Sequence, residues 1–139
     1  MNPMKRVETP QDSKVLEVLR EFKAMNPWKG TVGERIDKFV WLHGELCKIF
    51  NKKVHLAFDI PADTKDWYSS EGSYYTIGLD GREWMVLQGR LSVITYLHEF
   101  AHALGMDQQE AQEWATSIFR QVFPEKYKKL RNVGGMMVR

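Results

Sequence analysis

The sequence contains only one cysteine, Cys47, among its 139 residues, so an intrachain disulfide is excluded. A lone thiol without a Cys-x-x-Cys spacing is typical of a reducing compartment, and it excludes a cysteine-rich zinc knuckle. Because Cys47 falls within an apolar helical stripe, we expect it to be a core residue rather than a nucleophile.

The sequence also lacks long apolar runs and a strong charge of either sign. No stretch approaches the roughly 20 apolar residues that cross a bilayer, and residues 1–10 lack the apolar run of a secretory signal. The formal net charge of +2 is too small to indicate a nucleic-acid or membrane partner by itself. A basic cluster over 126–131 is interpreted as a solvated surface. We therefore expect a cytoplasmic protein that binds neither membranes nor nucleic acid.

The composition that is present is that of a globular domain. Hydrophobic residues make up 43% of the chain, aromatic residues 12% and charged residues 27%. This balance is typical of a folded protein rather than a disordered one. The length is that of one domain, so we predict a single domain over 1–139, with flexible ends at 1–9 and 132–139.

Capping residues and apolar periodicity divide the chain into helices and strands. Thr9-Pro10 is typical of a helix start, Asn26-Pro27 of a helix end and Asp80-Gly81 of a two-residue hairpin turn. The expected elements are a helix from Pro10 to the Asn26-Pro27 pair, a helix over about 32–50, a strand over 53–60, a polar loop over 61–72, strands over 73–79 and 83–87, a helix capped by Ser92 that ends at Gly105, and a helix capped by Asp107 that reaches about Phe123. The expected buried side of the second helix consists of Ile36, Phe39, Val40, Cys47 and Phe50. This order predicts an α+β fold, with a small antiparallel or mixed sheet and a hairpin beside the helix that starts at Ser92.

Residues 98–102 have the sequence His-Glu-Phe-Ala-His. Two histidines four positions apart on a helix project from the same face and can bind one zinc ion. Glu99 lies ~100° round the helix from His98 and can reach a water in the open coordination position. Zinc lowers the pKa of that water to about 7, and Glu99 can take its proton to generate the nucleophile for a peptide carbonyl. The motif therefore predicts Zn²⁺ bound by His98 and His102, with Glu99 as the catalytic base.

The helix that carries this motif is expected to bury one side and to present the motif on the other. Its apolar residues share one arc, roughly opposite the motif: Val93, Ile94, Leu97, Phe100, Ala101 and Leu104. A coincidental motif need not segregate in this way, so the pattern favours a metal site.

The motif itself does not set the third zinc ligand. The four histidines stand at positions 43, 55, 98 and 102, so none follows the motif. At the metzincin spacing the ligand would fall on Gln108, a poor zinc ligand. The downstream carboxylates Asp107, Glu110 and Glu113 remain as candidates.

Helical phase separates two of these candidates. In the last helix, Glu110 lies at the edge of the apolar arc, whereas Glu113 points nearly away from it. We therefore predict Glu110 as the third ligand. Asp107-x-x-Glu110 is also a capping-box spacing, which gives Glu110 a competing structural role. Asp107 and Glu113 stay open as alternatives.

A His-Glu-x-x-His helix followed by a glutamate on the next helix resembles the gluzincin type of zinc metallopeptidase. Residues 110–115, Glu-Ala-Gln-Glu-Trp-Ala, are similar to the Glu-Ala-Asn-x-Phe-Ala motif of ImmA/IrrE-like peptidases, from which they depart at Gln112 and Trp114. The lead-in over 95–99 also resembles that family's motif helix. The resemblance covers residues 92–119 in detail. It implies a zincin-like fold, Glu110 as zinc ligand, and intracellular proteolysis of a protein substrate, often a regulatory protein such as a transcriptional repressor.

Further residues are candidates for contacts with the substrate. The strand over 73–79 or its partner over 83–87 could bind a substrate backbone by strand addition. Tyr74, Tyr75 and Tyr96 could stabilise an oxyanion, although each is also a natural packing residue. The segment 61–72 is either a substrate-contacting loop or a plain connection.

Two other function classes remain open. A zinc-binding regulatory or interaction module without turnover would share the fold, but Glu99 favours an enzyme, because a structural site needs no general base. A nucleic-acid-binding protein would use the basic C-terminal stretch, but no recognisable nucleic-acid motif supports it. His43 and His55 are expected to be ordinary core or surface histidines.

Overall fold

The computed structural model describes residues 9–59, 70–77, 82–89, 91–133 and 136–138. The helices are α1 (Pro10–Ala24), α2 (Val32–Phe50), α3 (Val93–Ala103), α4 (Gln108–Val122) and α5 (Pro124–Tyr127). The strands are β1 (His55–Asp59), β2 (Ser70–Ile77), β3 (Arg82–Gly89), β4 (Arg131–Val133) and β5 (Met136–Val138). The α+β class predicted from the sequence is confirmed.

Side-chain caps fix where the helices begin. Thr9 and Asp12 form a reciprocal capping box at the start of α1, and Thr31 and Glu34 form another at the start of α2. Ser92 caps α3 by accepting a hydrogen bond from the backbone N–H of Thr95. These contacts satisfy backbone donors that have no partner within the helix. The predicted helix starts agree with the structure because they depend on such local chemistry.

The larger sheet is mixed and has the strand order β1-β3-β2. β2 pairs antiparallel with β3, with Ile77 opposite Arg82, whereas β1 pairs parallel with β3. The predicted hairpin pairing is thus present, although the Asp80-Gly81 turn lies outside the described residues. β2 starts at Ser70, so the end of the predicted loop over 61–72 is strand. Because β3 is paired on both sides, β1 and β2 are the edge strands of this sheet among the residues that the structure describes.

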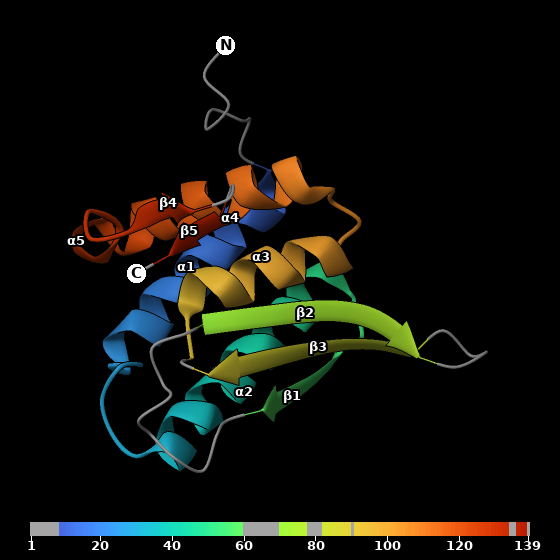
Figure 1. Cartoon of the computed structure of the whole chain (residues 1–139), viewed down its shortest axis with the longest axis horizontal. Coiled ribbons are helices and arrows are strands. Elements are labelled where there is room, and N and C mark those ends of the chain that lie inside the picture. Colours follow the sequence, from blue (N-terminus) through green and yellow to red (C-terminus); the bar gives the residue numbers. More distant parts are fainter. Residues whose placement is uncertain (1–8, 60–69, 78–81, 90, 134–135, 139) are drawn as a thin grey trace.

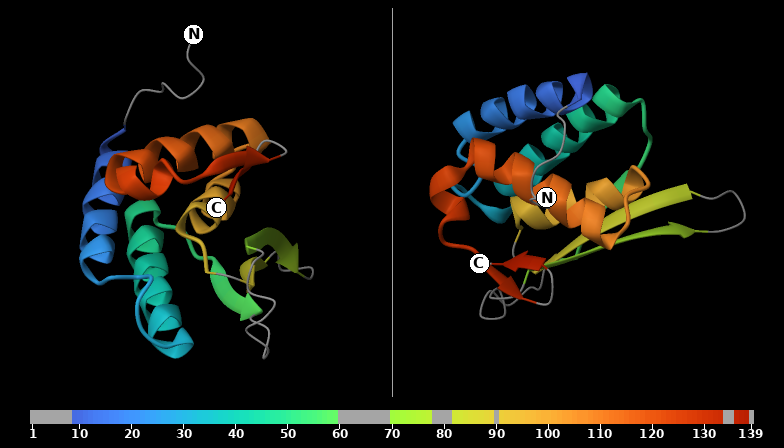
Figure 2. Two further views of the ribbon diagram at one scale, coloured as in Figure 1. Left: turned by 60° about the vertical axis from the view of Figure 1, so that its left-hand side comes forward. Right: turned by 90° about the horizontal axis from the view of Figure 1, so that it is seen from above.

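Helix α3 lies at the centre of the molecule (Figure 1). It contacts α4 on one side and strands β2 and β3 on the other. Helix α1 packs on both α2 and α4, and the turned views show these helices and the sheet surrounding α3 (Figure 2). The helix that carries the His-Glu-x-x-His motif is therefore covered on several sides.

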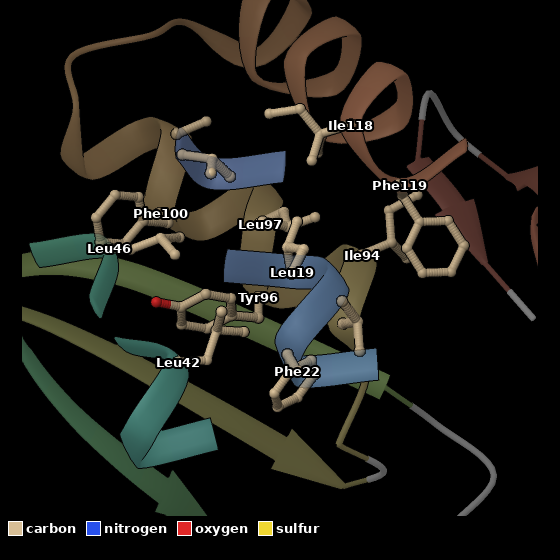
Figure 3. Packing of buried hydrophobic residues seen from close by; sticks show 14 of the residues in the cluster. Leu19, Phe22, Leu42, Leu46, Ile94, Tyr96, Leu97, Phe100, Ile118 and Phe119 are labelled. Atoms are coloured by element: carbon tan, nitrogen blue, oxygen red, sulfur yellow. The ribbon is translucent and has the colours of Figure 1, made fainter. Parts of the chain in front are cut away.

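The buried hydrophobic side chains form one core cluster around α3, to which Leu19 and Phe22 of α1, Leu42 of α2 and Ile118 of α4 contribute (Figure 3). Two predictions of burial were wrong. Val40 of α2 is 52% exposed, whereas Leu42, His43 and Leu46 are buried. The motif face of α3 is also covered, since His98 is only 2% exposed and Glu99 only 7%.

The end of the chain, where the sequence predicts a flexible tail over 132–139, contains two short strands. Strands β4 and β5 pair antiparallel, with Arg131 opposite Val138, and β5 contacts α4. Within the described ranges, none of the helices has both the length and the apolar character needed to cross a bilayer.

A buried polar network joins α2, α3 and the segment before β1. His43 Nε2 lies 2.6 Å from the carbonyl oxygen of Val54, and His43 Nδ1 lies 2.8 Å from the Tyr96 hydroxyl. The carbonyl can only accept, so the His43 Nε2–H donates to Val54 and the Tyr96 hydroxyl donates to Nδ1. Burial lowers the pKa of His43 and raises that of Tyr96, which favours the neutral form of both groups. His43 is therefore a core histidine, and Tyr96 has a packing role.

Substituting Tyr96→Phe removes this donor from a buried acceptor while keeping the ring. We expect the free energy of unfolding to fall by about 1–3 kcal/mol, as for other buried polar groups that lose a partner. Urea unfolding followed by circular dichroism measures the change. Tyr127→Phe, at a half-buried surface position, is the matched control. Equal stability of Tyr96→Phe and the parent protein would show that the hydroxyl contributes nothing.

Candidate metal centre

His98 and His102 lie one turn apart near the C-terminal end of α3. Their Nε2 atoms are 3.1 Å apart, and their rings meet edge to face. His98 is buried, and burial lowers its pKa, although hydrogen bonds with Gln108 and Gln112 oppose this effect. A lowered pKa favours the neutral imidazole, which is the form that binds a metal. The structure thus brings together the two histidines that the sequence predicted as ligands.

The turn after α3 determines which ring nitrogen of neutral His102 carries the proton. Gly105 has φ 94°, and the N–H groups of Gly105 and Met106 bond back to the carbonyls of His102 and Ala101. This is a Schellman turn, in which a glycine adopts the left-handed conformation at low cost. The turn places the Met106 carbonyl 3.0 Å from His102 Nδ1. Since that carbonyl can only accept, Nδ1 carries the proton of the neutral ring and Nε2 keeps its lone pair.

The same turn brings Gln108, the first residue of α4, to the histidine pair. Gln108 Oε1 lies 3.1 Å from His98 Nε2 and 3.1 Å from His102 Nε2. Together with the 3.1 Å between the two nitrogens, the three atoms form an equilateral triangle. Three potential ligand atoms therefore converge on one point. The sequence does not predict Gln108 as a ligand, because a neutral amide is a poor zinc ligand.

The donor atoms fit a zinc ion. A tetrahedral zinc with bonds of about 2.0–2.2 Å holds its ligand atoms about 3.3 Å apart, close to the 3.1 Å observed. In the tautomer with the proton on His102 Nδ1, the lone pairs of His102 Nε2 and Gln108 Oε1 face each other. His98 Nδ1 is buried and has no hydrogen-bond partner in the part of the chain that the structure describes. A metal bound by Nε2 of both rings would remove the repulsion between the lone pairs, and the proton of His98 would then lie on Nδ1.

Glu99 lies beside this pair on α3. Burial raises the pKa of its carboxyl above the usual value, and the nearby His102 partly offsets this effect. A raised pKa makes the carboxylate a better proton acceptor near neutral pH. Glu99 therefore has the environment expected of a general base.

Glu110, the predicted third ligand, is not part of this cluster. Its carboxylate accepts a hydrogen bond from the backbone N–H of Asp107 at 3.1 Å, and the Asp107 side chain caps the N–H of Glu110 in return. Glu110 and Asp107 are exposed, and Glu113 accepts a hydrogen bond from Gln109. Among the described residues, no group of three His, Cys, Asp or Glu side chains could hold a metal. The structure thus gives Glu110 the capping role that competed with the ligand role.

Glu110 lies outside the cluster because the opposite flank of α4 faces the histidines. Trp114 lies on the same flank as Glu110 and donates a hydrogen bond to Asp12 of α1, so this flank faces α1. Gln108 and Gln112 lie on the opposite flank and interact with His98. Helical phase alone identified the apolar arc correctly but could not show which of its two edges meets α3.

No family model, curated protein or solved structure matches this chain. The function is therefore argued from the residues of the site.

The other candidate residues lie away from the metal centre or outside what the structure describes. Tyr96 is fully buried beside His43. The side chains of Tyr74 and Tyr75 are not among the described ones. His55 stacks on Trp84 with ring centroids 4.7 Å apart. Cys47 is half-buried against the core, and burial raises its pKa, which disfavours the reactive thiolate.

Proposed function

We propose that this protein is a cytoplasmic zinc metallopeptidase with a zincin-like fold, of the gluzincin type to which ImmA/IrrE-like peptidases belong. The observation that supports it most is the pair of imidazole Nε2 atoms 3.1 Å apart, beside a buried glutamate on the same helix. Each of the three motif residues has an environment suited to its role. Such a combination can serve metal-assisted hydrolysis, and the resemblance of the motif to zinc metallopeptidases favours a peptide bond as the bond that is cleaved.

His98 and His102 hold the metal through Nε2, and the Met106 carbonyl keeps the His102 ring in the required tautomer. Bound zinc supplies a Lewis acid that polarises the scissile carbonyl and lowers the pKa of the attacking water. Glu99 accepts the proton of that water and can pass it to the amine of the leaving group. The covered position of α3 limits the access of bulk water to Glu99, which strengthens its electrostatic interactions.

The substrate class that fits is an extended segment of a protein, such as a regulatory protein. β2 is an edge strand of the mixed sheet and contacts α3, which carries the motif. A substrate backbone could pair with this edge and so lie alongside the motif helix. Of the two strands considered from the sequence, β3 is excluded as an edge because β1 and β2 flank it.

A zinc-binding regulatory or interaction module without turnover is the second candidate. The observation in its favour is the burial of His98 and Glu99, since a structural zinc site is also closed to solvent. The two functions differ in one measurable respect, because only the enzyme requires Glu99 for turnover.

Metal content tests the proposal. Purified protein reconstituted with Zn²⁺ and desalted is expected to hold about one zinc per chain by atomic spectroscopy. His102→Ala is expected to lose this zinc, because it removes one of the two imidazole ligands. His55→Ala, which removes a histidine outside the site, is the matched control and should keep it. Absence of zinc from the parent protein after reconstitution would overturn both the peptidase and the zinc-module proposals.

A further inference from the structure

We infer that Gln108, through its side-chain amide oxygen, is the third protein ligand of the metal. This inference rests on the zinc site proposed above and replaces the predicted carboxylate with a neutral oxygen donor. It would make the centre a His-His-Gln site built from α3 and the first residue of α4, so that the chain would share the His-Glu-x-x-His helix of gluzincins but not their glutamate ligand.

The placement of Gln108 depends on the backbone. The Schellman turn at Gly105 reverses the chain, and Asp107 caps α4 through the N–H of Glu110. Position 108 is thereby fixed as the first helical residue, close to the end of α3. Its Oε1 is equidistant, at 3.1 Å, from the two imidazole nitrogens. An oxygen that is equally far from both nitrogens is placed to share one ion with them.

A simple hydrogen-bonding role does not explain both contacts. Gln108 Oε1 could accept a proton from His98 Nε2, which would account for the first contact. In the tautomer whose proton is on Nδ1 and directed to the Met106 carbonyl, His102 has no Nε2–H to donate in the second contact. A cation shared by the three atoms would account for both contacts.

The carboxylate predicted as the third ligand is already engaged elsewhere. Glu110 completes the capping box with Asp107, and its flank of α4 faces α1 rather than the histidines. To bind the metal, Glu110 would have to give up this cap and reach round the helix. Gln108 needs no such rearrangement.

An amide ligand has a measurable consequence. A neutral oxygen binds zinc less tightly than a carboxylate, because it does not neutralise the charge of the ion. The parent protein should therefore gain affinity when a carboxylate is placed at the same position, and the near-isosteric change Gln108→Glu does this. Gln108→Ala removes the ligand. Since Gln108 is an exposed first-turn residue, neither change should prevent folding.

The experiment measures the zinc dissociation constant by competition with a chromophoric chelator at one pH. Gln108→Ala is expected to weaken binding by roughly tenfold or more, and Gln108→Glu to tighten it by a similar factor. Gln109→Ala is the neighbouring control and Glu110→Gln tests the alternative ligand; both should stay within about threefold of the parent. Glu110→Gln is suitable because glutamine can still complete a capping box. Urea unfolding of the metal-free variants shows that each is folded.

The outcomes separate this inference from the proposed function. If Glu110→Gln weakens zinc binding while Gln108→Ala does not, the inference is wrong, the ligand is Glu110, and the peptidase proposal stands. If all four variants bind zinc as the parent does, Gln108 is again excluded, with the zinc site intact. If the parent protein binds no zinc, both the inference and the proposed function are wrong.

Discussion

Substituting Glu99→Gln is expected to lower the rate of peptide hydrolysis by roughly 10²–10⁴-fold, the usual contribution of a general base. Glutamine keeps the shape of the side chain but cannot accept the proton of the attacking water. Glu99 contributes none of the three atoms that converge on the metal position, which come from His98, His102 and Gln108. Zinc should therefore remain bound to the variant. The variant therefore separates chemistry from metal binding.

The measurement is the initial rate of cleavage of fluorophore-labelled, unfolded casein by zinc-loaded protein, with the zinc dissociation constant determined in parallel. Glu45→Gln, on α2, is the matched control and should keep the parent rate. Full activity of Glu99→Gln would rule out Glu99 as the base. A parent protein that binds zinc tightly and cleaves neither casein nor itself would favour the module without turnover.

The helix boundaries could be predicted from the sequence because they depend on neighbouring residues. Thr9 and Asp12 cap α1 and Thr31 and Glu34 cap α2 through contacts within three positions. The His-Glu-x-x-His spacing is local in the same sense, since one helical turn brings His98 and His102 together whatever packs around them.

The approach of Gln108 to the histidine pair could not be predicted in this way, because it depends on how α4 docks on α3. The apolar arc of α4 has two polar edges, one with Glu110 and the other with Gln108 and Gln112. Sequence periodicity gives the arc but not the direction from which α3 approaches it. The hydrogen bond from Trp114 to Asp12 decides the orientation, and it joins residues 102 positions apart.

Other differences have the same origin in non-local packing. The periodicity of α3 predicted an open motif face, but His98 and Glu99 on that face are buried, and Gln108 of α4 contacts His98. The parallel pairing of β1 with β3 joins strands separated by β2 in the sequence. The pairing of β4 with β5 lies in a segment whose composition predicted only a flexible tail.

Trp114 links the core to the metal centre. Its side chain is 1% exposed, its indole N–H donates to Asp12 Oδ1 at 2.8 Å, and its ring lies 6.4 Å from that of Phe50. It therefore holds α4 against α1 while its ring approaches α2. Because α4 carries Gln108, the position of Trp114 also sets how this amide meets His98 and His102.

Substituting Trp114→Ala is expected to lower the free energy of unfolding by about 3–5 kcal/mol, the range for removing a buried aromatic side chain. Domains of this size are stable by only about 5–15 kcal/mol, so the variant should be close to unfolding. Urea unfolding of the metal-free protein, followed by circular dichroism, measures the effect. Trp41→Phe is the control at a half-buried position, where the indole N–H bonds to none of the residues that the structure describes.

A double-mutant cycle isolates the contact between the helices. Trp114→Phe and Asp12→Ala should each destabilise the protein, and Asp12→Ala also removes the hydrogen bond from the Thr9 N–H. Their coupling energy should be about 0.5–3 kcal/mol, because both remove the hydrogen bond between the indole and the carboxylate. If the docking of α4 positions Gln108, Trp114→Phe should also weaken zinc binding, although it lies outside the site. Additive effects in the cycle, with unchanged zinc affinity, would show that α4 is held over α3 by its apolar arc alone.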